Sequence, residues 1–100
     1  MVVQMKNLIK GFIWPAHIIE KCLAKHGVSP DEAEEAFSNY PRFKFWENGD
    51  VAGEDFFQCL GRSDAGRYLT VFFIFKMTGE ALIISARDMD AKEKKRYGKK

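Results

Sequence analysis

The spacing of hydrophobic residues in the first third of the chain predicts a short strand followed by a helix. Residues 8–14 (LIKGFIW) form an apolar run typical of a strand, and Pro15 ends it because proline lacks the amide hydrogen that a sheet requires. From Ala16 onward, apolar positions recur one helical turn apart, at Ile18, Ile19, Cys22, Leu23 and His26. Gly27 then stands where a left-handed residue commonly closes a helix.

A second helix is predicted to begin directly after the first. Ser29 is a favourable N-cap, Pro30 suits the first helical position, and Glu32 stands three residues after the cap, as in a capping box. Additional acidic residues in the first turns face the positive end of the helix dipole. We expect this helix to direct Ala33, Ala36 and Phe37 toward the core.

After Pro41 the pattern changes to an alternation that predicts four consecutive strands. These cover residues 42–46, 55–61, 67–76 and 80–87, with turns at Asn48-Gly49, at residues 63–66 and at Thr78-Gly79. The third of these strands is apolar on both faces, so we expect it at the centre of the sheet. A last helix opens with Asp90 as cap and Glu93 three residues later, and runs to Gly98.

The resulting element order is β-α-α-β-β-β-β-α, in a single domain spanning residues 1–100. Such an order indicates an α+β fold, with an antiparallel meander sheet and the helices packed on one face. The edge strand at the N-terminus is a candidate for pairing with a partner strand.

The net charge of the chain is uninformative, whereas the placement of charged residues along the chain is informative. The 16 Lys and Arg against 14 Asp and Glu give a net charge of +2, which does not by itself indicate a nucleic-acid-binding protein. However, acidic residues gather between residues 31 and 55, while residues 91–100 (AKEKKRYGKK) are strongly basic. This layout favours a polyanion or an acidic partner at the basic end.

The cysteines and the apolar runs exclude several classes of protein. Cys22 and Cys59 lie in apolar segments without metal-ligand spacing, so we expect two reduced core thiols, no metal site and no cofactor. Lys6 and Lys10 interrupt the N-terminal apolar residues, which leaves no signal-peptide core, and no run reaches the length of a membrane span. We therefore expect a cytoplasmic protein without membrane contact.

Candidate chemistry is concentrated in three arginines near strand ends. Arg62 ends one predicted strand, Arg67 opens the next and Arg87 ends the last, so a meander could bring all three to one end of the sheet. Three neighbouring guanidinium groups would favour an anion. The alternative for each one is a solvated side chain or an ion pair, with Asp64 and Asp88 as nearby partners.

Other basic and proton-carrying residues have competing interpretations. His26 can transfer protons near neutral pH, or it can simply pack and interact with the helix dipole at a helix end. Lys25 beside it is a surface candidate. In the C-terminal helix Lys95 and Arg96 could bind phosphates and Tyr97 could donate a proton or stack on a base, although a charged run is usually a solvated helix face.

The sequence resembles the BrnT family of type II toxins, small ribonucleases with a RelE-like fold. The resemblance is carried by FIW at 12–14, LAKHGVSPDEAEEAF at 23–37, GED at 53–55, LGRSDAGRYLTVFF at 60–73 and IISARDMDAKEKKRY at 83–97. Two departures stand out: Pro15 where members commonly have Asp, and Phe56 and Phe57 where they have a basic residue.

The resemblance implies a toxin that cleaves RNA without a metal and slows translation. The ribose 2′-hydroxyl would attack the phosphorus, with Arg67 and Arg87 stabilising the transition state and His26 or Tyr97 transferring protons. Lys25, Arg62, Lys95 and Arg96 would bind the RNA. The implied partner is a DNA-binding, BrnA-like antitoxin, and both a homodimer and a toxin–antitoxin heterotetramer are compatible with it. The alternative is a non-catalytic relative that binds a partner or RNA.

Overall fold

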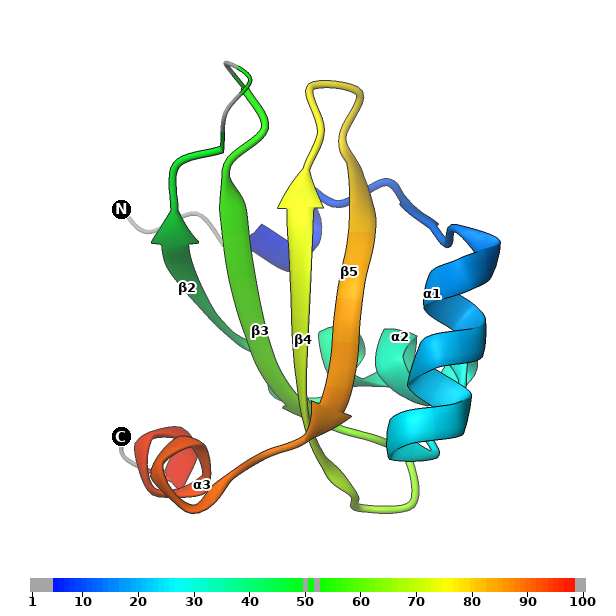
Figure 1. The fold of residues 1–100 in the computed structure, drawn as a ribbon. Coiled ribbons are helices and arrows are strands. Elements are labelled where there is room, and N and C mark those ends of the chain that lie inside the picture. The colour runs from blue at the N-terminus through cyan, green and yellow to red at the C-terminus, as the bar shows by residue number, and fades with distance from the viewer. Residues whose placement is uncertain (1–4, 50, 52, 99–100) are drawn as a thin grey trace.

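A computed structural model describes residues 5–49, 51 and 53–98 and shows a five-stranded sheet with helices (Figure 1). The strands are β1 (Gly11–Ile13), β2 (Arg42–Glu47), β3 (Phe56–Arg62), β4 (Tyr68–Phe75) and β5 (Glu80–Asp88). The helices are α1 (Ala16–Lys21), the π-helical turn η2 (Cys22–His26), α2 (Pro30–Ser38) and α3 (Ala91–Gly98), with a 3₁₀ turn η1 at Met5–Asn7. The predicted α+β class is confirmed.

The strand order in the sheet is β1-β5-β4-β3-β2. Strands β2 to β5 form an antiparallel meander, while β1 pairs with β5 in parallel. The strand that is apolar on both faces, β4, lies at the centre as expected. The first strand, Gly11–Ile13, is shorter than the predicted 8–14, and a 3₁₀ turn at Met5–Asn7 precedes it. The connection from β2 to β3 spans residues 48–55 rather than a tight Asn-Gly turn, and Asp50 lies outside the described residues.

The predicted helix boundaries agree closely with the structure. Gly27 has a left-handed φ of 62° at the end of η2, where its amide donates to the Leu23 carbonyl. Ser29 and Glu32 form both bonds of the capping box at the start of α2. Pro15 occupies the N-cap of α1 and supplies no side-chain bond there, as its replacement of an Asp implies.

The hydrophobic core lies between the sheet and the first two helical segments. The buried side chains of this layer come from α1, η2, α2 and the facing sides of β3, β4 and β5: Ile18, Cys22, Ala33, Ala36, Phe37, Cys59, Val71, Phe73 and Ile83. Helix α2 approaches β3 so closely that a Cβ at Gly61 would overlap the Ala36 carbonyl oxygen. Both cysteines are buried and free, which confirms the expected reduced thiols.

Helix α3 lies on the opposite face of the sheet, so the prediction that all helices pack on one face is wrong for this element. The neighbours Cys59 and Gln58 show this directly because successive strand residues point to opposite faces. The Cys59 thiol faces the Ala36 carbonyl of α2, whereas the Gln58 amide donates to Glu93 of α3. In Figure 1, α3 lies below β2 and β3, away from α1. The cause is chemical: the buried residue of α3 is a glutamate, which finds polar partners on that face.

Within the described part of the chain, no helix is both long and apolar enough to cross a membrane.

Candidate functional site

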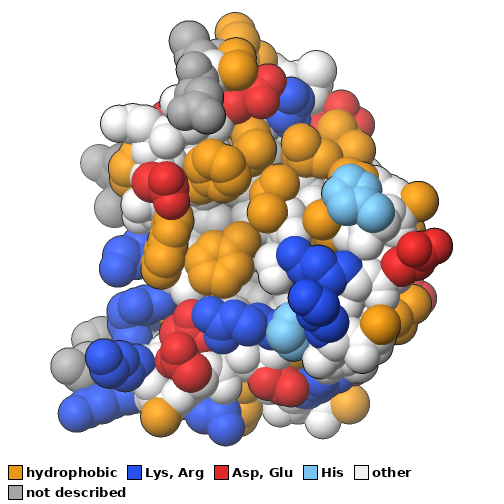
Figure 2. Space-filling model, viewed as in Figure 1, with side chains coloured by type: hydrophobic (Ala, Val, Ile, Leu, Met, Phe, Trp, Pro, Cys, Tyr) orange, Lys and Arg blue, Asp and Glu red, His pale blue; other side chains and the backbone are white. Residues whose placement is uncertain are grey.

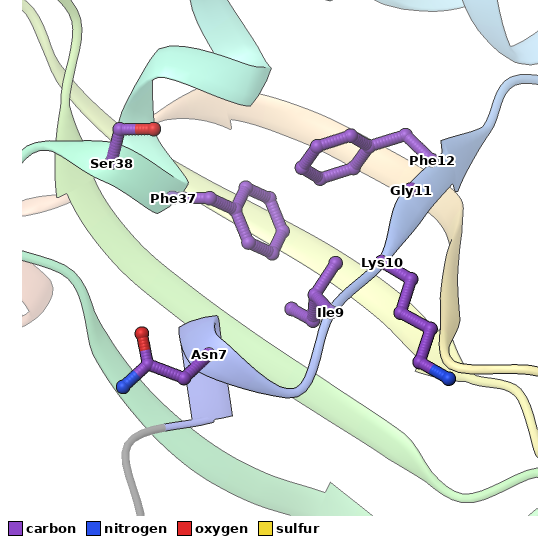
Figure 3. Close-up of a pocket in the computed structure, with 7 residues that line it drawn as sticks. All are labelled: Asn7, Ile9, Lys10, Gly11, Phe12, Phe37 and Ser38. Carbon is purple, nitrogen blue, oxygen red and sulfur yellow. The ribbon is translucent and has the colours of Figure 1, made fainter.

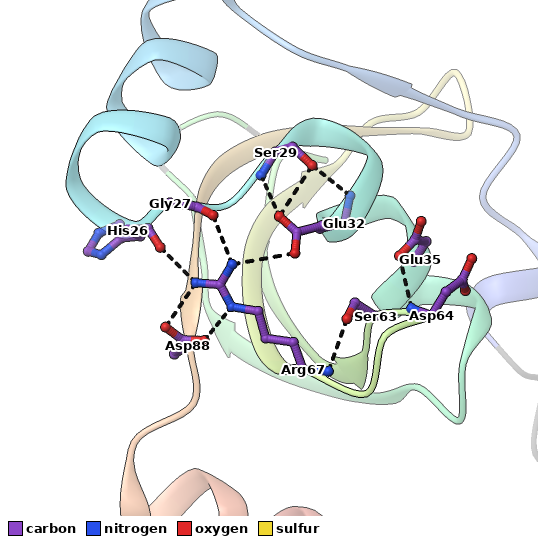
Figure 4. A network of polar contacts seen from close by, with 9 residues as sticks. All are labelled: His26, Gly27, Ser29, Glu32, Glu35, Ser63, Asp64, Arg67 and Asp88. Carbon is purple, nitrogen blue, oxygen red and sulfur yellow. Dashed lines mark hydrogen bonds and ion pairs between the residues drawn. The ribbon is translucent and has the colours of Figure 1, made fainter.

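Arg67 is the centre of a polar network that ties β4 to β5, η2 and α2 (Figure 4). Its Nε and Nη2 donate to the two carboxylate oxygens of Asp88, at 2.6 and 3.0 Å. The two Nη atoms also donate to the carbonyls of Gly27 at 2.8 Å and His26 at 2.7 Å. A weaker contact of 3.4 Å joins Nη1 to Glu32. These contacts use all five N–H donors of the guanidinium.

The internal contacts of Arg67 differ from the arrangement expected of a side chain that binds an external anion. All of its donors are engaged by the protein, and the hydrogen bond to Asp88 lowers the pKa of that carboxyl group. The two carbonyls that it binds belong to the end of η2, where helix carbonyls lack partners. We therefore assign Arg67 a structural role, namely capping the end of η2 and joining it to the sheet.

Arg87 is engaged by a different carboxylate on the other face of the sheet. Its Nη1 and Nη2 donate to the two oxygens of Glu93, at 2.8 and 3.0 Å. The side-chain amide of Gln58 donates to Oε2 of the same carboxylate at 2.9 Å, and the backbone amide of Asp90 donates to Oε1 at 2.9 Å. Four donors thus converge on a carboxylate that is only 5% exposed as a residue. The predicted cap of α3 is confirmed by this bond and by its reciprocal, from the Glu93 amide to the Asp90 side chain.

The three arginines therefore do not form the common anion pocket that the sequence suggested. The register places Arg62 opposite Tyr68 and Arg87 opposite Thr70, so both point to the face that carries α3. Asp88, the partner of Arg67, follows Arg87 directly and points to the other face. The topology thus brings two of the three arginines, Arg62 and Arg87, to one face, whereas Arg67 faces η2 and α2.

Of the three arginines at strand ends, Arg62 is the one whose guanidinium pairs with no carboxylate among the described residues. Its Cζ lies 5.1 Å from the centroid of the Tyr40 ring and 6.0 Å from that of Tyr68. The rings of Tyr68 and Tyr97 meet edge to face, with centroids 5.9 Å apart. Three tyrosines from separate segments thus surround one arginine.

These residues line an open pocket of about 510 Å³, which we call the tyrosine–arginine pocket. Its lining consists of Tyr40, Arg42, Arg62, Tyr68, Lys94, Tyr97 and Gly98. The lining holds three cations and no carboxylate, so its local charge is positive although the whole chain is nearly neutral. Aromatic rings beside cations are suited to bases and phosphates of single-stranded nucleic acid.

Tyr97 joins α3 to the loop before β2. Its hydroxyl donates to the Tyr40 carbonyl at 2.8 Å and approaches the Asn39 carbonyl at 3.4 Å. Tyr40 itself has a positive φ of 54°, a conformation that is uncommon for a residue other than glycine. Burial raises the pKa of Tyr97 and the nearby Arg62 partly opposes this, so the phenol keeps its proton at neutral pH.

The remaining predicted site residues lie apart from this pocket or serve the fold. Lys25 is exposed and His26 half-buried at the end of η2, and Figure 4 shows the His26 ring pointing away from the Arg67 guanidinium. Lys95 is exposed on α3, whereas Arg96 donates to the side-chain amide oxygen of Gln58 at 2.6 Å. Of the eight predicted residues, the structure brings Arg62 and Tyr97 together in one pocket. The basic residues Lys99 and Lys100 lie outside the described residues.

Sequence reasoning missed four lining residues: Tyr40, Arg42, Tyr68 and Lys94. Only the alternation of β4, which turns Tyr68 to the same side as Thr70, could have indicated one of them. The others come from separate segments, and their proximity depends on how α3 packs.

A second pocket lies between the N-terminal segment and α2 (Figure 3). Its volume is about 300 Å³, and it is lined by Asn7, Ile9, Lys10, Gly11, Phe12, Phe37 and Ser38. Lys10 is its one charged lining residue, so this pocket lacks the grouped cations of the first.

Comparison with known proteins identifies the family. The model of a family described as the ribonuclease toxin BrnT of type II toxin–antitoxin systems matches residues 14–93. The chain belongs to this family. A crystal structure of the Brucella abortus ribonuclease toxin BrnT shares the fold, with a TM-score of 0.58 and 21% identity over 80% of this chain and 96% of that one. No curated protein matches the sequence. Membership in the BrnT family implies RNA as the substrate and an antitoxin as the partner, and the matched region ends within α3.

Proposed function

We propose that this BrnT-family chain is an endoribonuclease that binds and cuts RNA at the tyrosine–arginine pocket. The observation that carries the proposal is Arg62, a guanidinium held between tyrosine rings without a carboxylate partner among the described residues. A cation left without an internal partner is available for a phosphate.

Binding follows from the chemistry of the lining. Tyr40 is 75% exposed, so a base can stack on its ring while Arg62 contacts a phosphate. Arg42 and Lys94 add positive charge along the path of the strand. Figure 2 shows that further Lys and Arg side chains gather over the lower part of this face, near α3, while hydrophobic side chains cover more of the upper part.

Cleavage in the proposed reaction uses the RNA's own nucleophile. The 2′-oxygen forms a bond to the adjacent phosphorus and loses its proton to a water molecule, and the bond from phosphorus to the 5′-oxygen breaks. The leaving 5′-oxygen takes up a proton, and the products are a cyclic phosphate and a 5′-hydroxyl. Arg62 would stabilise the negative charge of the pentacoordinate state, a contribution of roughly 3 kcal/mol for one well-placed donor. Tyr97, protonated at neutral pH, is the proposed proton donor.

Other roles follow from the contacts of each residue. Arg87 is a second phosphate-binding candidate on the same face, although Glu93 holds it in this structure. Lys25, His26 and Lys95 would contact more distant parts of a long RNA, and Arg96 would position α3. For the partner we propose a DNA-binding, BrnA-like antitoxin, in a heterotetramer with the toxin inside the cytoplasm.

Incubation of the purified protein with total RNA tests the proposal. We expect Arg62→Gln to lower the cleavage rate roughly a hundredfold and Tyr97→Phe to lower it by at least about tenfold. Lys21→Gln is the matched control because it removes one cation of α1 that does not line the pocket. An equal loss in all three variants would show that general charge, and not this pocket, determines activity.

A second function, RNA binding without cleavage, is favoured by one observation. The residues that line the pocket include no carboxylate and no imidazole, so no conventional general base stands beside Arg62. Retarded migration of RNA by the wild type without any cleavage product would establish this second function and refute the first.

A further inference from the structure

The buried carboxylate of Glu93 lies in a set of donors that matches the needs of a phosphate. Arg87 binds it with two parallel bonds of 2.8 and 3.0 Å, and Gln58 adds a third from strand β3. These three donors belong to the sheet, whereas Glu93 belongs to α3. A phosphodiester offers two non-bridging oxygens in the fork geometry that arginine prefers. The sheet therefore carries an anion site that α3 fills with its own side chain.

The packing of α3 differs from that of α2 in a way that permits a phosphate to replace the Glu93 carboxylate. Glu93 is the buried side chain of α3, whereas α2 buries Ala33, Ala36 and Phe37. Beneath α3 the sheet buries the polar side chains of Gln58 and Thr70, which bond to each other at 3.0 Å. Other side-chain hydrogen bonds from α3 to the sheet and its loops run from Arg96 to Gln58 and from Tyr97 to Tyr40.

A polar interface of this kind has little intrinsic preference for the Glu93 carboxylate over an external anion. A buried ion pair gains Coulomb energy but loses hydration of both charges, so its net contribution is small, whereas an unpaired buried charge is costly. The Arg87 side chain is 31% exposed, so it can stay partly solvated while one anion is exchanged for another, and the anion need not be Glu93. By contrast, moving α2 away from the sheet would expose an apolar core to water.

The position of this site connects it to the tyrosine–arginine pocket. Arg62 and Arg87 point to the same face, with β4 between their strands, so roughly 10 Å separates the two strands. A single RNA strand can place phosphates at both points.

We propose that Glu93 is an internal phosphate mimic that keeps an RNA phosphate site on Arg87 and Gln58 closed until the first turn of α3 opens, while Tyr97 in the last turn stays in the tyrosine–arginine pocket. The inference rests on the proposed function, since it assigns a second phosphate site to the same RNA. Glu93 thus limits RNA binding, and its removal opens the site without creating any new contact.

Binding of a short 2′-O-methylated RNA, which the 2′-oxygen cannot cleave, tests the inference. We expect Glu93→Gln to bind at least about fivefold more tightly than the wild type, with a salt dependence steeper by about one phosphate contact. Glu32→Gln is a matched control because Glu32 is also the third residue of a capped helix and also contacts an arginine, on the other face. The gain should disappear in the double variant Arg87→Gln, Glu93→Gln. Equal binding by Glu93→Gln and Glu32→Gln would overturn the inference.

Amide hydrogen exchange in the wild type provides a second measurement that needs no variant. If RNA replaces Glu93, amides in the first turn of α3 should exchange faster when the methylated RNA is bound, because the capping bonds between Glu93 and Asp90 are lost. Unchanged or slower exchange in the first turn of α3 would overturn the inference even if Glu93→Gln fails to fold. Cleavage of unmodified RNA is measured separately: cleavage without tighter binding by Glu93→Gln refutes only this inference, and absence of RNA binding by every protein refutes both proposals.

Discussion

Arg67 and Asp88 join the entrance of β4 to the end of β5 through two parallel hydrogen bonds, at 2.6 and 3.0 Å. The same guanidinium caps the carbonyls of His26 and Gly27, so one side chain connects the sheet to the helical layer. Arg67, which the sequence predicted to be catalytic, thus holds β4, β5 and the end of η2 together.

Replacing Arg67 by lysine should lower stability even though the charge is kept. Lysine has three donors at a single point, so it cannot serve both carbonyls and both carboxylates. We expect the free energy of unfolding in urea to fall by about 1 to 2 kcal/mol. Arg42→Lys, on an exposed position of β2, is the control and should change it by less than about 0.5 kcal/mol. Comparable losses in both variants would argue against the structural role.

The pair with Arg67 should also make stability depend on acid pH. The hydrogen bond from Arg67 lowers the pKa of Asp88 below its ordinary value of 3.8. The contribution of the pair is fully present above that ordinary value and is lost as the pH falls through the lowered pKa of the folded state. Urea midpoints measured from pH 6 to pH 2 should therefore fall more steeply at the acid end for the wild type than for Asp88→Asn. Parallel curves would contradict the prediction.

Tyr97 should cause a loss of stability at alkaline pH. Burial raises its pKa above the ordinary value of 10, because the phenolate is less well solvated in the folded state. The resulting stabilisation is fully present below pH 10 and disappears as the pH rises through the higher folded pKa. In thermal melts between pH 8 and pH 12, Tyr97→Phe should show a shallower decline than the wild type. A decline that is unchanged in the variant would show that other groups cause it.

Gly61 should tolerate no side chain because of the close approach of α2. A Cβ at this position would overlap the carbonyl oxygen of Ala36, which also accepts the Cys59 thiol at 3.8 Å. We expect Gly61→Ala to lower the free energy of unfolding by about 2 kcal/mol, since overpacking forces the helix away from the strand. Gly11→Ala is the matched control, because a Cβ at Gly11 meets no atom within 4 Å. In thermal melts, the melting temperature of Gly61→Ala should lie clearly below that of Gly11→Ala.

Local patterns in the sequence determined the elements and their ends. The capping boxes at Ser29 and Asp90 and the left-handed Gly27 depend on residues within a few positions of one another, so the chain specifies them before any tertiary contact forms. The double-sided apolar pattern of β4 likewise specified its central place, because only a strand covered on both sides can bury both faces. The RelE-like label and the roles of individual site residues stay predictions.

Tertiary structure alone decided which groups meet. Tyr97 bonds to a carbonyl 57 residues away, and Arg96 to a glutamine 38 residues away, distances along the chain at which no spacing rule operates. The face that α3 covers depended on whether a buried Glu93 could find four donors, and those donors come from β3, β5 and the start of α3 itself. Local propensity acts through neighbouring residues, whereas the desolvation of a charge is offset only by partners that the complete fold brings into place.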